Sequence, residues 1–248
     1  MMEIAPGEAH LWYVFHEEIR DPALIQAYHG LMTPEEAERQ ARFYFPKGRH
    51  EHLCARALVR TTLSRYAPVD PRRWTFVKGE HGRPDIAGPP GGPPLRFNLS
   101  HTEGLIACLI TLDREVGVDV EYIDRPSSTV EIADRFFSPS EVRALRSQPE
   151  ERQRSRFFDY WTLKEAYIKA RGMGLALPLD QFSFHLEPRD EGRDIRISFD
   201  PRLADDPESW QFSLWSPSPQ HRMAAAIRKG RGGAPLAIVL RECVPLAR

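Results

Sequence analysis

Two segments of the chain share a short sequence pattern that is typical of the start of a helix. This repetition constrains the fold more than any other feature. TPEE at 33–36 and SPSE at 138–141 each supply a hydroxyl residue as the helix cap, a proline at the first helical position and a glutamate three residues after the cap. A longer helix is expected after each, around residues 50–66 and 155–171, followed by a turn and a strand. The two halves therefore share an order of elements.

The paired strands are also repeated. Residues 96–110 and 211–227 both predict a strand, a polar turn and a second strand. We therefore expect an α+β fold of two similar lobes, residues 1–112 and 113–248, which pack across a pseudo-twofold interface. The proline- and glycine-rich stretch 84–94 predicts an exposed connector, since it suits neither a helix nor a central strand.

Two local features complete the outline of the second half. The charged segment 187–194 predicts a turn between two strands. Gly172, in the sequence GMG, is expected to end the preceding helix, because glycine readily adopts the left-handed conformation of a C-terminal cap.

Composition excludes several classes of protein. The 248 residues include 34 basic and 35 acidic side chains, so the net charge of −1 gives no global reason to bind nucleic acid or an anionic membrane. The first residues have no signal-peptide pattern, and no stretch approaches the roughly 18 apolar residues that span a bilayer. We expect a cytoplasmic protein that binds neither nucleic acid nor membrane.

The cysteines carry no obvious chemistry. Cys54, Cys108 and Cys243 are odd in number and widely spaced, which argues against a disulfide framework and against a zinc site. Cys54 and Cys108 lie in apolar runs and are expected in the core.

Two acidic residues lie on one predicted strand, GVDVEYID. Asp119 and Glu121 are two residues apart, so they project from the same face with roughly 6.6 Å between their positions along the strand. Valines flank them, as in a buried or half-buried strand. Ionised carboxylates in such surroundings destabilise the fold unless a cation compensates them.

A third carboxylate lies on the predicted helix WTLKEAYIK. Glu165 precedes Lys169 by one helical turn, beside apolar residues on both sides. Mg²⁺ prefers oxygen ligands and usually takes a few carboxylates together with substrate phosphate, so three acids and a lysine suit a bound diphosphate. From these residues alone an alternative stays open, in which Glu165 and Lys169 form an ordinary surface pair and the strand acids face solvent.

A serine and a histidine follow the predicted strand FNL. Ser100 and His101 precede a glycine-containing turn, where hydroxyl, imidazole and backbone amides can meet a phosphate. A nucleophilic serine is disfavoured, because neighbouring residues on a strand face opposite sides and no G-x-S-x-G sequence is present. A simple surface role for His101 remains the alternative.

Several strings, taken together, resemble the Sfp-type 4'-phosphopantetheinyl transferases of the AcpS/Sfp superfamily. They are FNLSH at 97–101, GVDVE at 117–121 and FFDYWTLKEAYIKARGMGL at 157–175, supported by ARFYFP, GEHGRP and RFFSPSE. The resemblance runs from about residue 36 to residue 185. It implies a monomer of two similar α+β lobes with the active site between them.

The resemblance also implies an activity. Such an enzyme transfers 4'-phosphopantetheine from coenzyme A to a serine of an apo acyl or peptidyl carrier protein and releases adenosine 3',5'-bisphosphate. It uses Mg²⁺, with Mn²⁺ as an alternative. Its carriers serve fatty-acid, polyketide, nonribosomal-peptide or aminoadipate pathways. Two other functions use the same residues: a Mg²⁺-dependent phosphohydrolase, and a noncatalytic module that binds coenzyme A or a carrier.

Roles for individual residues follow from the same resemblance. The metal ligands are Asp119, Glu121 and Glu165; Lys169 contacts the diphosphate, and Glu165 is also a candidate base. Coenzyme A is expected to contact Ser100, His101, Arg83, Arg39 and, as a weaker candidate, Arg56. Glu36 and His52 depart from relatives that carry lysine and threonine near the 3'-phosphate. The segment 122–137 is the expected carrier platform, with Arg125 and Arg135 attracting an acidic partner.

Overall fold

The structure is a computed structural model, and it describes residues 1–126, 130–188 and 193–247. The chain divides into two compact units, Met1–Arg114 with Leu236–Arg248, and Glu115–Pro235. The C-terminal segment belongs to the first unit because strand β11 (Ala237–Glu242) pairs in parallel with β1 (Glu8–Phe15). This differs from the expected division, which assigned all of 113–248 to the second lobe.

The first unit is built on a four-stranded sheet with the order β11-β1-β5-β4. Strands β4 (Leu95–Thr102) and β5 (Leu105–Leu112) form the antiparallel hairpin predicted for 96–110. The other elements are η1 (His16–Glu18), α1 (Pro22–His29), α2 (Pro34–Ala41), α3 (Pro46–Leu63), η2 (Pro71–Arg73), β2 (Thr75–Lys78) and β3 (Pro84–Gly88).

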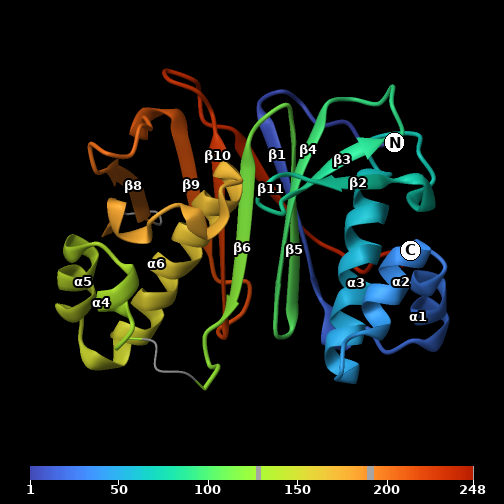
Figure 1. Cartoon of the computed structure of the whole chain (residues 1–248), viewed down its shortest axis with the longest axis horizontal. Coiled ribbons are helices and arrows are strands. Elements are labelled where there is room, and N and C mark those ends of the chain that lie inside the picture. Colours follow the sequence, from blue (N-terminus) through green and yellow to red (C-terminus); the bar gives the residue numbers. More distant parts are fainter. Residues whose placement is uncertain (127–129, 189–192, 248) are drawn as a thin grey trace. The chain divides into compact units, whose positions relative to one another are not determined.

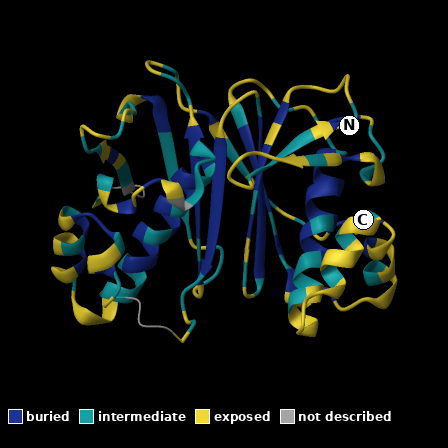
Figure 2. Ribbon diagram, viewed as in Figure 1, coloured by how far each residue is buried: buried dark blue, intermediate teal, exposed yellow. Residues whose placement is uncertain are grey.

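The long helix α3 packs against β4 and β5 and supplies much of the core of the first unit (Figures 1 and 2). Its apolar residues Leu53, Ala57 and Leu58 are buried, and Cys54 and Cys108 lie in the same core, as expected. The capping box that was predicted at α2 is present, since Thr33 accepts from the Glu36 backbone and Glu36 from the Thr33 backbone.

The second unit contains a three-stranded antiparallel sheet with the order β6-β10-β9. Its strands are β6 (Val116–Tyr122), β9 (Trp210–Trp215) and β10 (His221–Arg228), and the last two form the second predicted hairpin. The remaining elements are α4 (Ala133–Phe136), α5 (Pro139–Arg146), α6 (Glu150–Arg171), η3 (Gly174–Ala176), η4 (Leu179–Gln181), β7 (Phe182–Pro188), β8 (Arg193–Phe199) and η5 (Pro207–Ser209).

Helix α6 lies across this sheet, in contact with β6, β9 and β10 (Figure 1). The approach to β6 is unusually close at Gly117, where an added Cβ would lie 2.0 Å from the carbonyl oxygen of Ala166. A glycine is therefore required for the helix to pack at this distance. The helix ends at Gly172, which has φ of 65° and confirms the predicted left-handed cap.

The sequence predicted loops at 84–94 and 187–194, and the structure describes the first in full and the second in part. The first five residues of the stretch 84–94 form β3, which pairs only with β2 in a small two-stranded sheet and is not a central strand. In the charged segment 187–194 the first two residues end β7 and the last two begin β8, whereas the turn predicted between them, at residues 189–192, lies outside the described part of the chain. The α+β class agrees with the sequence.

Candidate functional site

The two acids on β6 face helix α6. Gly117, Asp119 and Glu121 alternate along the strand and share one face, and Gly117 touches the α6 backbone. Asp119 is 5% and Glu121 9% exposed. Strand β6 itself is buried along its length (Figure 2). The solvent-facing alternative for these acids is therefore excluded.

Helix α6 brings a lysine to the first of these acids. The Lys169 Nζ lies 2.6 Å from Oδ1 of Asp119, and both residues belong to the second unit. Glu165, one turn earlier on α6, is half-buried, and the negative charge of Asp119 acts on it. The strand and the helix thus bring Asp119, Glu165 and Lys169 together, as the sequence predicted.

The second acid on β6 has two partners that sequence reasoning did not assign to it. Arg125 donates from Nη1 to Oε2 of Glu121 at 2.9 Å, and the Trp161 side chain also donates to this carboxylate. Trp161 precedes Glu165 by four residues, so the helical periodicity could have placed it on this face. No local periodicity indicated Arg125, because Glu121 lies on a strand that ends at Tyr122.

The cluster holds more negative than positive charge in partly buried surroundings. Burial, and then the charge of Asp119, raise the pKa of Glu121 to about 7, although Arg125 and Lys169 act in the opposite direction. The same two causes raise the pKa of Glu165, with only Lys169 opposing them. The carboxylates therefore favour any further positive charge that enters the cluster.

The oxygen donors suit Mg²⁺ in kind, because it prefers carboxylates and binds few of them. In the described residues, however, no three acidic, histidine or cysteine side chains are grouped closely enough to enclose a metal ion. Lys169 and Arg125 instead hold two of the carboxylates. The donor chemistry fits the expected metal, and Asp119, Glu121 and Glu165 are the residues that would hold it.

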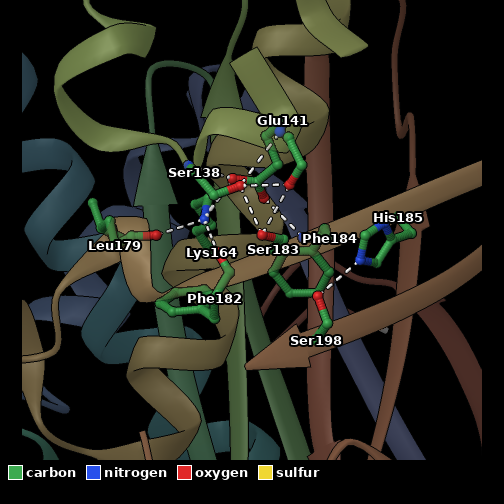
Figure 3. Close-up of polar contacts among 10 residues, drawn as sticks. Ser138, Glu141, Lys164, Leu179, Phe182, Ser183, Phe184, His185 and Ser198 are labelled. Carbon is green, nitrogen blue, oxygen red and sulfur yellow. Dashed lines mark hydrogen bonds and ion pairs between the residues drawn. The ribbon is translucent and has the colours of Figure 1, made fainter. Parts of the chain in front are cut away.

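A buried ion pair fixes α6 on its other side (Figure 3). Lys164 Nζ lies 2.8 Å from Oε2 of Glu141 and donates to the carbonyl oxygens of Leu179 and Phe182, each at 2.7 Å. Glu141 also accepts from the backbone of Ser138, where it completes the second predicted capping box. This network holds the helix immediately before Glu165.

The basic candidates of the first unit gather between α2 and α3. A hollow of about 440 Å³, called here the α2–α3 hollow, is lined in part by Arg39, His52 and Arg56. Burial, and then the charges of Arg56 and Arg39, lower the pKa of His52 to about 4, so this imidazole is neutral at pH 7. A site lined in this way suits an anion.

Glu36 has a structural role at this hollow. Its carboxylate lies 2.9 Å from Nη2 of the buried Arg60 and 3.8 Å from Nη1 of Arg56, besides closing the α2 capping box with Thr33. The residue that departs from the relatives at this position is therefore held within the protein by two arginines and by the cap.

The remaining candidates lie on β4 and in the turn between β2 and β3. Ser100 is buried, whereas the side chain of His101 is 52% exposed, as expected for neighbours on a strand. The two side chains therefore do not share a face. Arg83 lies in the turn, where its backbone oxygen accepts from Gly79.

The sequence also matches known families. Residues 115–227 match the model of the 4'-phosphopantetheinyl transferase superfamily, and residues 21–111 match that of the N-terminal part of 4'-phosphopantetheinyl transferase. The 4'-phosphopantetheinyl transferase HetI of Nostoc sp. is 36% identical over 193 residues, which cover 77% of this chain and 80% of HetI. The chain belongs to the 4'-phosphopantetheinyl transferase superfamily.

Further members of the 4'-phosphopantetheinyl transferase superfamily are similar over much of their length. The transferase Sfp of Bacillus subtilis is 32% identical over 199 residues, covering 80% of this chain and 83% of Sfp. Among solved structures, the holo-[acyl-carrier-protein] synthase of Thermotoga maritima matches with a TM-score of 0.37 and 23% identity, covering 47% of this chain and 64% of that one.

The expected carrier platform of this 4'-phosphopantetheinyl transferase is described in part, since residues 127–129 lie outside the described ranges. Arg135 is exposed, but Phe137 is buried and stacks on Phe157, so part of the platform is core. Arg125 is engaged with Glu121. Among the described residues, no helix is both long enough and apolar enough to cross a membrane.

Proposed function

We propose that this protein transfers 4'-phosphopantetheine from coenzyme A to a serine of an apo acyl or peptidyl carrier protein. The observation that carries the proposal is the cluster on β6 and α6, where Lys169 contacts Asp119 and the pKa values of Glu121 and Glu165 are raised. Such a cluster favours a bound cation, which can in turn hold a diphosphate.

The reaction is a displacement at phosphorus. The serine oxygen of the carrier attacks the β-phosphorus of coenzyme A, and the bond from that phosphorus to the leaving oxygen of adenosine 3',5'-bisphosphate breaks. The serine proton passes to Glu165 or to a water. Glu165 is suited to accept it, because burial raises the basicity of its carboxylate.

The other residues of the site supply positive charge or contact coenzyme A. Lys169 places a positive charge beside Asp119, where it can balance charge on the diphosphate. Bound at Asp119, Glu121 and Glu165, Mg²⁺, or Mn²⁺ in its place, would supply positive charge to the phosphate oxygens. In the first unit Arg39, Arg56, Arg83, Ser100 and His101 are proposed to contact coenzyme A. Trp161 and Arg125 support Glu121.

The proposed partners are carriers of fatty-acid, polyketide, nonribosomal-peptide or aminoadipate pathways, bound by a monomer in the cytoplasm. The α2–α3 hollow, with its arginines and neutral His52, suits a phosphate of coenzyme A. The exposed Arg135 suits the acidic surface of a carrier.

The decisive experiment follows the intact mass of an apo carrier protein incubated with the full chain, coenzyme A and Mg²⁺. We expect the carrier to gain one phosphopantetheine with the wild type and with Glu151→Gln, an exposed acid on the same helix. Glu165→Gln should abolish the gain while coenzyme A still binds. Release of phosphate without a modified carrier would instead indicate a phosphohydrolase, and binding without turnover would indicate a noncatalytic module.

A further inference from the structure

A carboxylate on helix α3 holds the ring of His101. Nδ1 of His101 lies 2.9 Å from Oε1 of Glu51, and the Glu51 side chain is 20% exposed against 52% for His101. The contact joins α3 to the end of β4, within the first unit. It uses only one nitrogen of the ring.

The surroundings of this pair are ordered and charged. The buried His16 contacts the backbone oxygen of Thr102 at 3.4 Å and lies 4.0 Å from the second oxygen of Glu51. Lys47 bridges Glu17 of η1 and Glu103 of the turn between β4 and β5. The titratable and charged groups gathered around His101 are Glu51, Lys47 and His50 of α3, His16 and Glu17 of η1, and Glu103 of the turn.

The chemistry of the ring decides what this contact can do. Glu51 is an acceptor, so Nδ1 of His101 must carry a proton to bond to it. In a neutral imidazole the other nitrogen, Nε2, would then be an acceptor and could not bond to a phosphate oxygen. His101 can therefore donate to Glu51 and to a phosphate at once only when both nitrogens are protonated.

The state of Glu51 agrees with this requirement. Burial raises the pKa of Glu51, but the hydrogen bond and the charge of His101, with smaller contributions from His16 and Lys47, outweigh it, so that the pKa lies below its ordinary value. The carboxylate is thus negatively charged at neutral pH. His101 faces a full charge rather than a neutral acid.

We propose that Glu51 is a positioning residue for phosphate binding by His101: it orients the ring through Nδ1, so that Nε2 is directed to a phosphate of coenzyme A. This proposal rests on the proposed function, in which His101 contacts coenzyme A. It adds a residue of α3 that lies outside the strings through which the sequence resembles its family.

The first experiment examines the ring without any substrate. The ¹⁵N and ¹H resonances of the His101 imidazole are recorded by NMR at one pH in the full-length wild type and in Glu51→Leu, with His101→Ala to assign them. We expect an Nδ1 proton that exchanges slowly with solvent in the wild type and is lost in Glu51→Leu, because the carboxylate that accepts it is absent. An equally protected Nδ1 proton in both proteins would overturn the proposal.

The second experiment measures transfer. The KM for coenzyme A of Glu51→Leu should exceed that of the wild type by about 3- to 10-fold with kcat nearly unchanged. In a His101→Ala background Glu51→Leu should have no further effect on KM. A penalty that persists in that background, or one that falls on kcat and not on KM, would show that Glu51 has only a structural role.

The controls separate the possible causes. Glu17→Gln removes a carboxylate of the same cluster that contacts Lys47, and it should leave the KM for coenzyme A unchanged. With 3'-dephospho-coenzyme A the Glu51 penalty disappears if His101 binds the 3'-phosphate and remains if it binds the diphosphate. Absence of transfer by the wild type would contradict the proposed function, whereas a wild-type KM in His101→Ala would overturn only the present proposal.

Discussion

Lys169 and Asp119 form a hydrogen bond of 2.6 Å between Nζ and Oδ1, which joins helix α6 to strand β6. Asp119 also acts electrostatically on Glu121 and Glu165, and the charge of Lys169 lowers the pKa of both glutamates against larger opposing effects. Lys169 is thus the cation of α6 within the acidic cluster. Its removal tests the electrostatics of the whole cluster.

Replacing Lys169 with methionine should lower the rate of transfer to a carrier protein by about 100-fold or more, the usual loss when one charged donor is removed from a phosphate site. Lys169→Arg keeps the charge and should retain more of the rate. Single-turnover assays at saturating coenzyme A measure the effect. A wild-type rate in Lys169→Met would contradict the assigned role of Lys169.

Glu121 makes stability depend on pH in the absence of divalent cations. Its pKa rises from 4.5 to about 7 on folding, so the folded state favours the protonated carboxyl. The resulting contribution to stability is present below pH 4.5 and is lost as the pH rises through about 7. The free energy of unfolding should fall across this window by about 3 kcal/mol.

Urea denaturation in a chelating buffer at intervals between pH 4.5 and 8 measures this dependence. Glu121→Gln should flatten it, since the amide does not titrate. Mg²⁺ should stabilise the wild type more at pH 8 than at pH 6, because a metal ligand must lose its proton first. An equally steep profile in Glu121→Gln would assign the dependence to other groups.

Gly117→Ala should separate β6 from α6. The added Cβ would lie 2.0 Å from the carbonyl oxygen of Ala166 and 2.5 Å from the backbone nitrogen of Ala170, so the helix must move. We expect a loss of about 1 to 3 kcal/mol in the free energy of unfolding, together with reduced transfer, because Glu165 and Lys169 move with the helix. Gly7→Ala, where the added Cβ meets no atom within 4 Å, is the matched control.

Lys164→Met should destabilise the second unit strongly. Burial lowers the pKa of Lys164, and the charge of Glu141 opposes this shift, so each member of the pair depends on the other. Removing the lysine leaves the fully buried Glu141 carboxylate without its cation, at a cost of about 3 to 5 kcal/mol. The double variant Glu141→Leu with Lys164→Met should recover part of this loss. The denaturation midpoints of the wild type, the single variant and the double variant measure these changes in stability.

Glu36→Lys would introduce the lysine that some relatives carry, yet it should reduce stability. Glu36 completes the α2 capping box and pairs with Arg60, which is only 1% exposed, so the substitution places a second positive charge beside a buried guanidinium. We expect a loss of about 2 to 4 kcal/mol. Glu38→Lys, on the exposed side of the same helix, should cost less than 1 kcal/mol. Thermal denaturation compares the two variants.

The local sequence predicted much of the fold. Both capping boxes, the cap at Gly172 and the two hairpins were predicted correctly, because each depends on a few neighbouring residues. The face shared by Asp119 and Glu121 followed from strand periodicity, and the position of Lys169 one turn after Glu165 from helical periodicity. These are properties of the backbone geometry at short range.

Contacts between distant segments could be decided only in the tertiary structure. The pairing of β11 with β1, and the contact of Glu51 with His101, join residues far apart in the chain. Arg125, for which contact with a carrier stays a prediction, pairs with Glu121. The sequence by itself determined which elements form and which residues carry charge. The tertiary structure decided which charges meet, because burial and long-range packing select partners that no local spacing specifies.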